Sequence, residues 1–194
     1  MYKRQASQED NTSLEKEKKK ERKKHIIEWT VYAIVLVALY ISFHFIWMIG
    51  KIPSESMEPT LMIHDWTIGS RTIYKDEMPE RGDIVIFYSD EEQETMVKRV
   101  IGLPGEKVTI EDAKIYINDS ETPLKEDYLK ETWTEATGPF EFEVPKDSYL
   151  VLGDNRNDSY DARYWDHTYV SKDKIIGKAY FIYYPFQRLG SLYK

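Results

Sequence analysis

The chain has 194 residues, of which 27 are Lys or Arg and 34 are Asp or Glu, so its formal net charge is −7. This negative charge argues against a general nucleic-acid binder, because such proteins gain affinity by neutralising phosphates. The chain has no cysteine, which excludes a disulfide scaffold, a thiolate zinc site, an iron–sulfur cluster and a cysteine nucleophile.

The first part of the chain is a basic segment. Residues 1–25 hold nine basic and five acidic residues, a net charge of +4, whereas residues 26–194 hold 18 basic and 29 acidic residues, a net charge of −11. Within the basic segment, residues 15–25 carry seven basic and three acidic side chains. We interpret residues 1–25 as a solvated basic tail.

Residues 26–50 contain the most apolar stretch of the chain. From Trp29 to Ile49 there are 21 residues without Asp, Glu, Lys or Arg, and a helix of that length spans roughly 31 Å, about one bilayer core. The alternatives are a buried core helix, which would show a polar face, and a cleaved secretory signal, which would be shorter and followed by an A-x-A-like site. We predict an uncleaved anchor at 26–50. The positive-inside rule then places residues 1–25 in the cytoplasm and residues 51–194 outside.

Residues 51–194 read as short strands bounded by turn residues. This pattern is typical of an antiparallel sandwich or barrel, so we predict a mainly β, barrel-like domain. Residues 118–139 are polar, and residues 126–131 within them fit a short helix or a loop excursion equally well. The expected strand runs are 66–69 leading into 71–74, 83–88, 96–101, 107–110, 114–118, 140–145, 148–152 and 175–184.

The segment after the anchor carries two serines between two prolines. Pro53 and Pro59 fix the backbone on either side of Ser54 and Ser56, and a stiff loop that presents a hydroxyl suits a nucleophile. The alternative is an ordinary Pro/Ser linker that leaves the membrane.

Lys98 lies inside an apolar strand run. Alternation places it on one face with Met96 and Val100. If that face is buried, desolvation lowers the pKa of the amine, and a neutral amine can take a proton from a serine hydroxyl. The alternative is a lysine whose charged end reaches solvent from an edge strand.

A third unusual segment runs from Gly153 to Arg163. It packs three acidic residues, two arginines and a serine into eleven residues after a predicted strand. The alternative is a turn rich in Asn and Asp with surface ion pairs, each of which contributes little to stability.

Together these segments resemble the type I signal peptidases, specifically the bacterial serine–lysine branch. Four boxes of that family occur in the family's order: S-M-x-P-T-L, G-D-[IV]-V, K-R-[IV]-x-G-x-P-G and G-D-N-R-x-x-S-x-D-[SA]-R. A single N-terminal anchor is typical of its Gram-positive members. The boxes match Ser56–Leu61, Gly82–Val85, Lys98–Gly105 and Gly153–Arg163.

The resemblance implies a role for each matching residue. Ser56 would be the nucleophile and Lys98 its general base. Ser54 would donate its hydroxyl to the oxyanion hole, and Ser159 would orient the lysine amine. No cofactor or metal is implied. An ion-pair network that holds the lysine strand against the last box would comprise Asp154, Asp161, Arg99 and Arg163.

The resemblance also implies the substrates, which are secretory preproteins cleaved after A-x-A-like sequences. We expect an extended substrate that adds a strand to a sheet edge, with membrane lipid and the protein-export channel as further partners and no nucleic acid. The chain departs from the family after Trp165, where Asp166–Val170 has two extra residues. The small apolar substrate pocket is expected to be lined by Ile52, Met57, Leu61, Met96 and Val97.

Two other functions fit parts of the pattern. A self-cleaving repressor-type serine–lysine protease would be soluble with a DNA-binding region, which the anchor argues against. A membrane-tethered β domain that binds exported proteins without cutting them would share the anchor and the fold, but it has no need of both Ser56 and Lys98.

Overall fold

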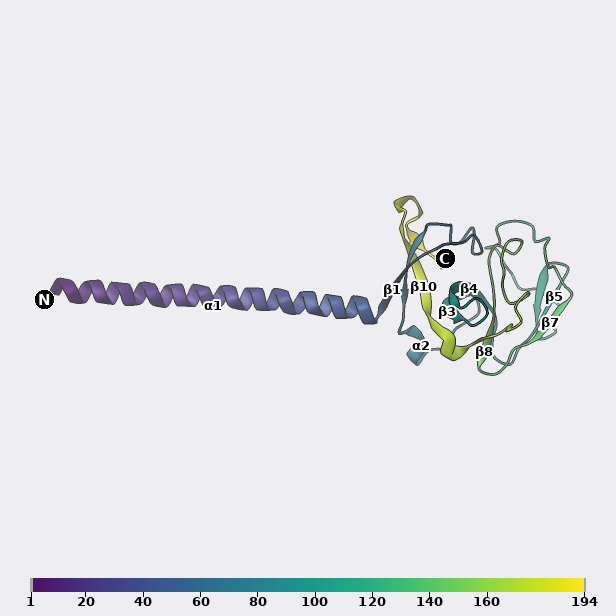
Figure 1. Cartoon of the computed structure of the whole chain (residues 1–194), viewed down its shortest axis with the longest axis horizontal. Helices are drawn as coiled ribbons and strands as arrows, with labels where there is room; N and C mark the ends of the chain where they lie inside the picture. Colours follow the sequence, from purple (N-terminus) through teal and green to yellow (C-terminus); the bar gives the residue numbers. More distant parts are fainter. Residues whose placement is uncertain (1, 194) are drawn as a thin grey trace. The chain divides into compact units, whose positions relative to one another are not determined.

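The computed structural model describes residues 2–193 and divides into two compact units, one ending at His44 and one beginning at Phe45 (Figure 1). The first unit is made of helix α1, Tyr2–Phe45. No glycine or proline interrupts this stretch, so nothing in the backbone breaks the helix. Lys18–Phe45 is long and apolar enough to cross a membrane.

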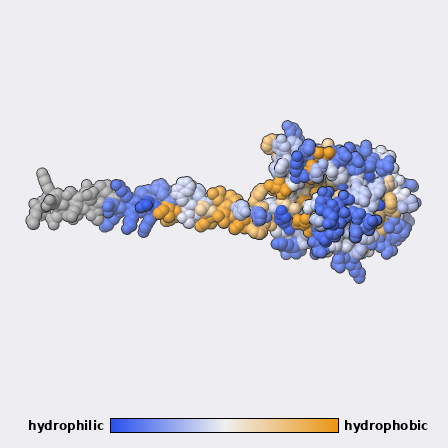
Figure 2. All heavy atoms as spheres, viewed as in Figure 1, coloured by the Kyte–Doolittle hydropathy of each residue, from blue (hydrophilic) through white to orange (hydrophobic). Residues whose placement is uncertain are grey.

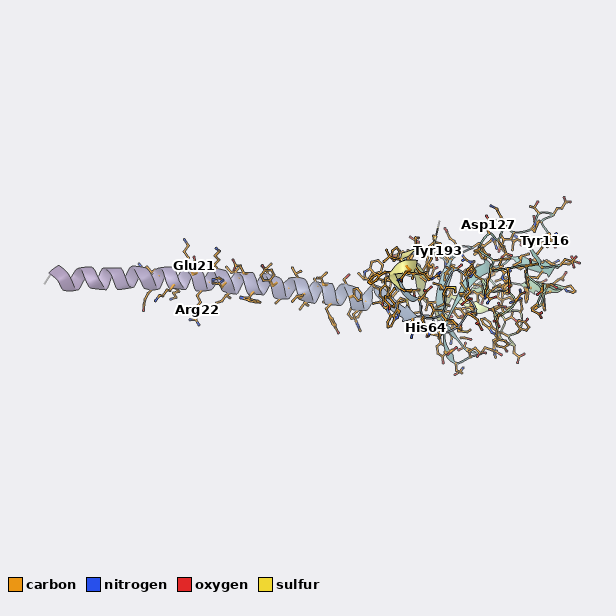
Figure 3. All side chains as sticks on the ribbon, turned by 90° about the horizontal axis from the view of Figure 1, so that it is seen from above. Glu21, Arg22, His64, Tyr116, Asp127 and Tyr193 are labelled. Atoms are coloured by element: carbon orange, nitrogen blue, oxygen red, sulfur yellow. The ribbon has the colours of Figure 1, made fainter. Side chains whose placement is uncertain are left out.

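The apolar part of α1 is exposed throughout. The side chains from Ile26 to Phe45 project on all sides of the helix (Figure 3) and form a hydrophobic band beyond the hydrophilic basic part (Figure 2). A helix that is hydrophobic all round is suited to lipid rather than to water. The helix therefore fits a single-pass membrane protein.

The predicted apolar run does not remain helical to its end. Helix α1 ends at Phe45, and Trp47–Lys51 forms strand β1 instead. Strand β1 pairs antiparallel with β2, Trp66–Ser70, with Ile49 opposite Ile68. The helix thus ends before the C-terminal end of the anchor predicted at 26–50, and the residues from Trp47 onward form backbone hydrogen bonds with β2. The bounds of the anchor stay a prediction.

The second unit is mainly antiparallel β-sheet, which confirms the predicted fold class. The main sheet has eight strands in the order β1-β2-β10-β3-β4-β8-β9, with β11 also paired to β10. A separate sheet has the order β6-β5-β7. The remaining strands of the main sheet are β3 (Ile84–Ser89), β4 (Glu94–Gly102), β8 (Ser148–Leu152), β9 (Val170–Ser171), β10 (Ile175–Tyr184) and β11 (Gly190–Ser191).

A second sheet and three short helices complete the unit. Its strands are β5 (Lys107–Glu111), β6 (Lys114–Ile117) and β7 (Phe140–Glu143), and the short helices are α2 (Ile73–Asp76), η1 (Lys172–Lys174) and η2 (Phe186–Arg188). Most predicted strand runs are confirmed, but 71–74 is wrong, since Ile73 and Tyr74 lie in α2. Residues 118–139 contain neither helix nor strand, so the helical alternative for 126–131 is wrong and the loop excursion is found.

Two hydrophobic cores lie on opposite faces of β3. Val85 and Phe87 pack into the larger core, whereas Ile84 and Ile86 pack into the smaller one. Because β3 is covered on both faces, its sequence is continuously apolar rather than alternating. The neighbouring strand β4 places Lys98 opposite Val85, on the face of the larger core.

Candidate active site

The loop that carries Ser54 and Ser56 is fixed to the core by its own apolar side chains. Ile52, Met57 and Leu61 are buried in the smaller core. Both serines remain at the surface of the loop, and their Oγ atoms lie 3.4 Å apart. The backbone N–H of Ser56 donates no hydrogen bond within the described residues. The loop therefore presents two hydroxyls and one free backbone donor together.

Lys98 is fully buried beside this loop, with 1% of its surface exposed. Its Nζ donates a hydrogen bond to Ser159 Oγ at 3.1 Å, and among the described residues it forms no ion pair. Burial lowers the pKa of this amine from 10.5 to about 8, while the charge of Asp161 opposes the shift and that of Arg163 supports it. The amine is therefore poised to lose its proton near physiological pH.

Gly153 brings the serine loop against the segment that contains Ser159. Asn155 N donates to Ser56 O at 3.0 Å, and Asn155 Nδ2 donates to Glu55 O at 3.2 Å. A Cβ at Gly153 would overlap both Ser159 Oγ and the Ser56 carbonyl oxygen. Only glycine fits between these two atoms, so this position sets how closely the two segments approach.

Ser54, Ser56 and Lys98 line one cavity of about 290 Å³. No hydrogen bond joins Ser56 to Lys98 among the described residues, which is common before substrate closes a site. Four of the five predicted pocket residues line the cavity, namely Ile52, Met57, Met96 and Val97. Leu61 does not, because it is fully buried in the core under the loop.

The cavity has two walls that sequence reasoning missed. One is β1, which contributes Met48–Lys51, and the other is the start of β4, which contributes Glu94 and Thr95. No histidine lines it. Among the described side chains, no group of three or more His, Asp or Glu is placed to hold a metal ion.

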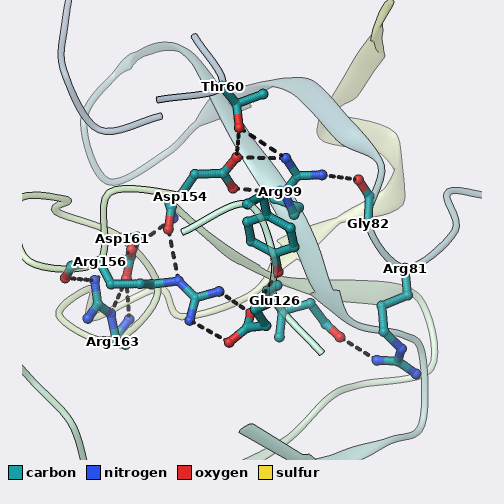
Figure 4. A network of polar contacts seen from close by, with 12 residues as sticks. Thr60, Arg81, Gly82, Arg99, Glu126, Asp154, Arg156, Asp161 and Arg163 are labelled. Atoms are coloured by element: carbon teal, nitrogen blue, oxygen red, sulfur yellow. Dashed lines mark hydrogen bonds and ion pairs between the residues drawn. The ribbon is translucent and has the colours of Figure 1, made fainter. Parts of the chain in front are cut away.

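The four residues expected to form one ion-pair network form two separate pairs (Figure 4). Arg99 donates to Asp154 through Nε at 2.8 Å and Nη2 at 2.6 Å, which joins β4 to the segment after β8. Arg163 donates to Asp161 through Nε at 2.8 Å and Nη2 at 3.0 Å. Asp161 Oδ2 also accepts the backbone N–H of Gly153 at 2.9 Å. The second pair therefore stabilises residues 153–163 by contacts within that segment.

Further residues around these pairs were not predicted. Thr60 Oγ1 donates to Asp154 Oδ2 at 2.5 Å. Arg156, which lies inside the last box, pairs with Glu126, and the Tyr128 ring covers the guanidinium of Arg99. Arg156 could have been noticed from its position in a box, but Glu126 and Tyr128 lie in a segment with no motif.

The chain is similar in sequence to several known proteins. The family described as "Signal peptidase, peptidase S26" matches residues 23–184. Signal peptidase I of Leptolyngbya laminosa is 44% identical over 149 residues, covering 73% of this chain and 70% of that protein. Signal peptidase I T of Bacillus subtilis (strain 168) is 36% identical over 194 residues, covering 94% and 97%.

Two further similarities come from other bacteria. Signal peptidase IB of Staphylococcus aureus (strain COL) is 34% identical over 179 residues, covering 84% of this chain and 92% of that protein. The crystal structure of a signal peptidase I from Enterococcus faecalis V583 is 37% identical, with a TM-score of 0.43, and covers 53% of this chain and 97% of that one.

Proposed function

Because the chain belongs to the signal peptidase family, peptidase S26, we propose that it is a membrane-bound serine endopeptidase that uses a Ser56–Lys98 dyad. The family makes it a peptidase hydrolase that removes signal peptides from preproteins. Cleavage after A-x-A-like sites is part of the proposal. One observation supports the dyad. The Lys98 amine is buried, forms no ion pair among the described residues, and lies on the cavity that Ser54 and Ser56 also line.

The first chemical step uses Lys98 as a base. Its neutral amine donates one N–H to Ser159 Oγ, which leaves the lone pair available to take the proton of Ser56. The Ser56 oxygen then bonds to the scissile carbonyl carbon, and the carbonyl electron pair moves onto oxygen. Among the described residues no carboxylate pairs with Lys98, so the resulting ammonium can return its proton in the next step.

The oxyanion would be bound by Ser54 and Ser56. The Ser54 hydroxyl and the free backbone N–H of Ser56 lie on the same loop. A single donor of this kind contributes about 2.7–4 kcal/mol to the transition state. Collapse of the tetrahedral intermediate breaks the C–N bond, and the lysine proton goes to the leaving amine. The Lys98 amine then deprotonates a water molecule, whose oxygen bonds to the acyl carbon. The ester bond to Ser56 breaks, and the lysine proton returns to the Ser56 oxygen.

The cavity is lined by the edges of two strands, β1 and the start of β4, and an extended substrate fits between them. Strand β1 ends the main sheet and pairs only with β2. The Glu94–Lys98 half of β4 pairs only with β3, since β8 begins its pairing at Arg99. A preprotein strand can therefore take its backbone hydrogen bonds from these edges. The mainly apolar lining suits apolar side chains near the serine, and a preference for small ones such as alanine is part of the proposal.

The membrane arrangement is also part of the proposal. The basic tail 1–25 would be cytoplasmic, α1 would anchor the chain in the cell membrane, and the β unit would be extracytoplasmic. Membrane lipid and the protein-export channel would then be partners besides the preproteins. Because the chain has no cysteine, Ser13→Cys and Ser120→Cys report the two sides by labelling intact cells with an impermeant maleimide. Only Ser120→Cys should react, and labelling of Ser13→Cys instead would reverse the orientation.

The chemistry is tested on the full chain in detergent or lipid with a preprotein that has one A-x-A site. Wild-type protein should release the mature product, and Ser56→Ala and Lys98→Ala should each abolish the release. Lys98→Arg should not restore it, because arginine cannot act as a neutral base. The matched control Lys174→Ala, at an exposed lysine paired with Asp90, should cleave normally. Full activity in any of the three site variants contradicts the dyad. Binding of the preprotein without cleavage by wild-type protein would favour a binding domain.

A further inference from the structure

Residues 126–135, here called the strap, contain neither helix nor strand. They contact the three segments that carry the candidate site, which are the serine loop 54–61, strand β4 and residues 153–163. The strap lies in the polar stretch 118–139, which carries none of the family boxes. We propose that the strap positions Lys98 and Ser56 relative to each other, with Tyr128 and Glu126 as positioning residues for peptide cleavage. The inference rests on the proposed Ser–Lys mechanism.

The contact with the lysine strand is made by Tyr128. The centre of its ring lies 4.0 Å from the Arg99 guanidinium carbon, a cation–π contact. Arg99 follows Lys98 in β4 and is bound edge-on by Asp154. The ring therefore covers the face of the guanidinium, while Asp154 binds its edge. Together the two contacts exclude water from the Arg99–Asp154 ion pair.

The contact with the last segment is made by Glu126. Its carboxylate pairs with Arg156, whose Nε donates to Gly153 O at 2.9 Å. The Tyr128 hydroxyl donates to Glu126 Oε1 at 2.6 Å. Tyr128 and Glu126 thus join Arg99 of β4 to Arg156, and through it to the glycine that lies between Ser56 and Ser159.

Three other contacts fix the strap in place. Lys130 pairs with Glu58 in the serine loop at 2.9 Å. The Trp133 ring lies 4.7 Å from the Arg156 guanidinium carbon. Asn157 accepts the Thr134 N–H at 2.7 Å. These bonds tie the strap both to the loop of the nucleophile and to the segment of Ser159, so its loss would loosen the site at several points at once.

The position of the strap has an electrostatic consequence for Lys98. Burial is the largest influence on the pKa of the lysine amine, and it lowers that pKa. Charged groups shift it further: Arg163 lowers it, and it is raised by Asp161, Asp154 and Glu92. Removal of the Tyr128 ring loosens the Arg99–Asp154 contact that holds β4 in place, so water reaches the amine. The loss of burial raises the pKa of Lys98 and reduces the fraction of neutral base at a given pH.

The test compares Tyr128→Ala, Tyr128→Phe and Lys125→Ala in the full chain. Tyr128→Phe keeps the ring over Arg99 and removes only the hydroxyl. Lys125 is an exposed member of the same polar stretch that pairs with Asp127. Among the described residues it forms no hydrogen bond or ion pair with the three segments. Each variant is assayed for kcat, KM and the pH dependence of kcat/KM per molecule of folded protein. Hydrogen exchange of peptides covering 54–61 and 153–163 is measured in parallel.

We expect Tyr128→Ala to lower kcat about 10–100-fold, since small misplacements of reacting groups have effects of that size. The rise of kcat/KM should move to higher pH, and both peptides should exchange faster. Tyr128→Phe should recover most of the lost rate, and Lys125→Ala should match wild type.

The inference is overturned if Tyr128→Ala keeps the kcat and pH profile of wild type. It is also overturned if only the folded fraction falls while the rate per folded molecule and the profile stay unchanged. If wild-type protein cleaves no preprotein, the proposed function fails instead, and the exchange measurements still decide whether the strap orders the two segments.

Discussion

The Nζ of Lys98 lies 3.1 Å from Ser159 Oγ and has no carboxylate within ion-pair distance among the described residues. Arg99, the next residue, takes both oxygens of Asp154 instead. Adjacent side chains of β4 therefore differ in their contacts. Arg99 joins β4 to the segment after β8 through its ion pair with Asp154. Lys98 is buried without an ion pair among the described residues, which lowers the pKa of its amine well below that of a free lysine.

The first prediction concerns pH. The pKa of Lys98 is lowered by burial to about 8, and in the proposed mechanism the active form is the neutral amine. The value of kcat/KM should therefore rise with pH through about 8, with a tenfold fall for each pH unit below that value. A profile of kcat/KM against pH on a preprotein substrate checks this. A rise centred near 10.5, the ordinary lysine value, would contradict burial as the cause.

The second prediction concerns the stability that the lysine costs. Between pH 8 and 10.5 the unfolded chain binds the Lys98 proton and the folded chain does not, so the free energy of unfolding rises with pH in that window. Below it the cost is about 3 kcal/mol. Lys98→Met should stabilise the β unit at pH 7 by about 2 kcal/mol, less than the full cost because Ser159 loses a hydrogen bond.

Thermal melts of both proteins at pH 7 and pH 10 measure this effect. At pH 7 the Lys98→Met variant should melt about 4–8 °C above wild type, and the gap should shrink towards pH 10. An unchanged gap across the two pH values would show that packing, and not protonation, causes the difference.

The third prediction concerns Gly153. A methyl group there would overlap Ser159 Oγ and the Ser56 carbonyl oxygen, so Gly153→Ala must push the two segments apart. We expect cleavage to fall at least 100-fold, as expected for a displacement of about 1 Å. Gly190→Ala is the control, because its nearest neighbour, Arg188 O, is 3.9 Å away. Normal cleavage by Gly153→Ala would show that the spacing is not needed.

The fourth prediction concerns Arg188, whose Nε lies 3.0 Å from both oxygens of Asp65. It also donates to the carbonyl oxygens of Pro59 and Thr60 in the serine loop. Because Asp65 is 1% exposed, Arg188→Ala leaves a buried carboxylate unpaired. We expect the free energy of unfolding to fall by about 1–3 kcal/mol. Breaking a fully buried ion pair costs about 3–5 kcal/mol, and the cost is smaller here because the arginine is partly exposed. Denaturant unfolding checks it, with Lys174→Ala expected to change stability by less than 1 kcal/mol.

Some of the architecture follows directly from the sequence because it depends on local pattern. The continuous apolar run of β3 predicts a strand covered on both faces, and Ile84 and Val85 do enter different cores. Alternation along β4 places Lys98 on the face of Met96 and Val100, and the structure buries it there. The resemblance of the boxes predicts that Ser56, Lys98 and Ser159 lie together. In the structure Ser56 and Lys98 line one cavity, and the lysine amine bonds Ser159.

Other parts could not be predicted because they depend on partners distant in the chain. Trp47–Ile49 is as apolar as the helix before it, and only pairing with β2 makes it a strand. Leu61 has the side chain of a pocket residue, but it supports the loop from the core. The role of Tyr128 depends on an arginine 29 positions away, and no local pattern reports such a contact.

The contacts of the strap also bear on how relatives of this chain can be recombined. A chimaera that exchanges residues 118–139 as a neutral insert would keep every family box and still deprive Arg99 and Arg156 of their partners. Such an exchange should succeed only when the donor segment delivers an aromatic ring and a carboxylate to the same two arginines. Compatibility between donor and recipient is thus decided by two side chains outside the boxes, rather than by overall sequence identity.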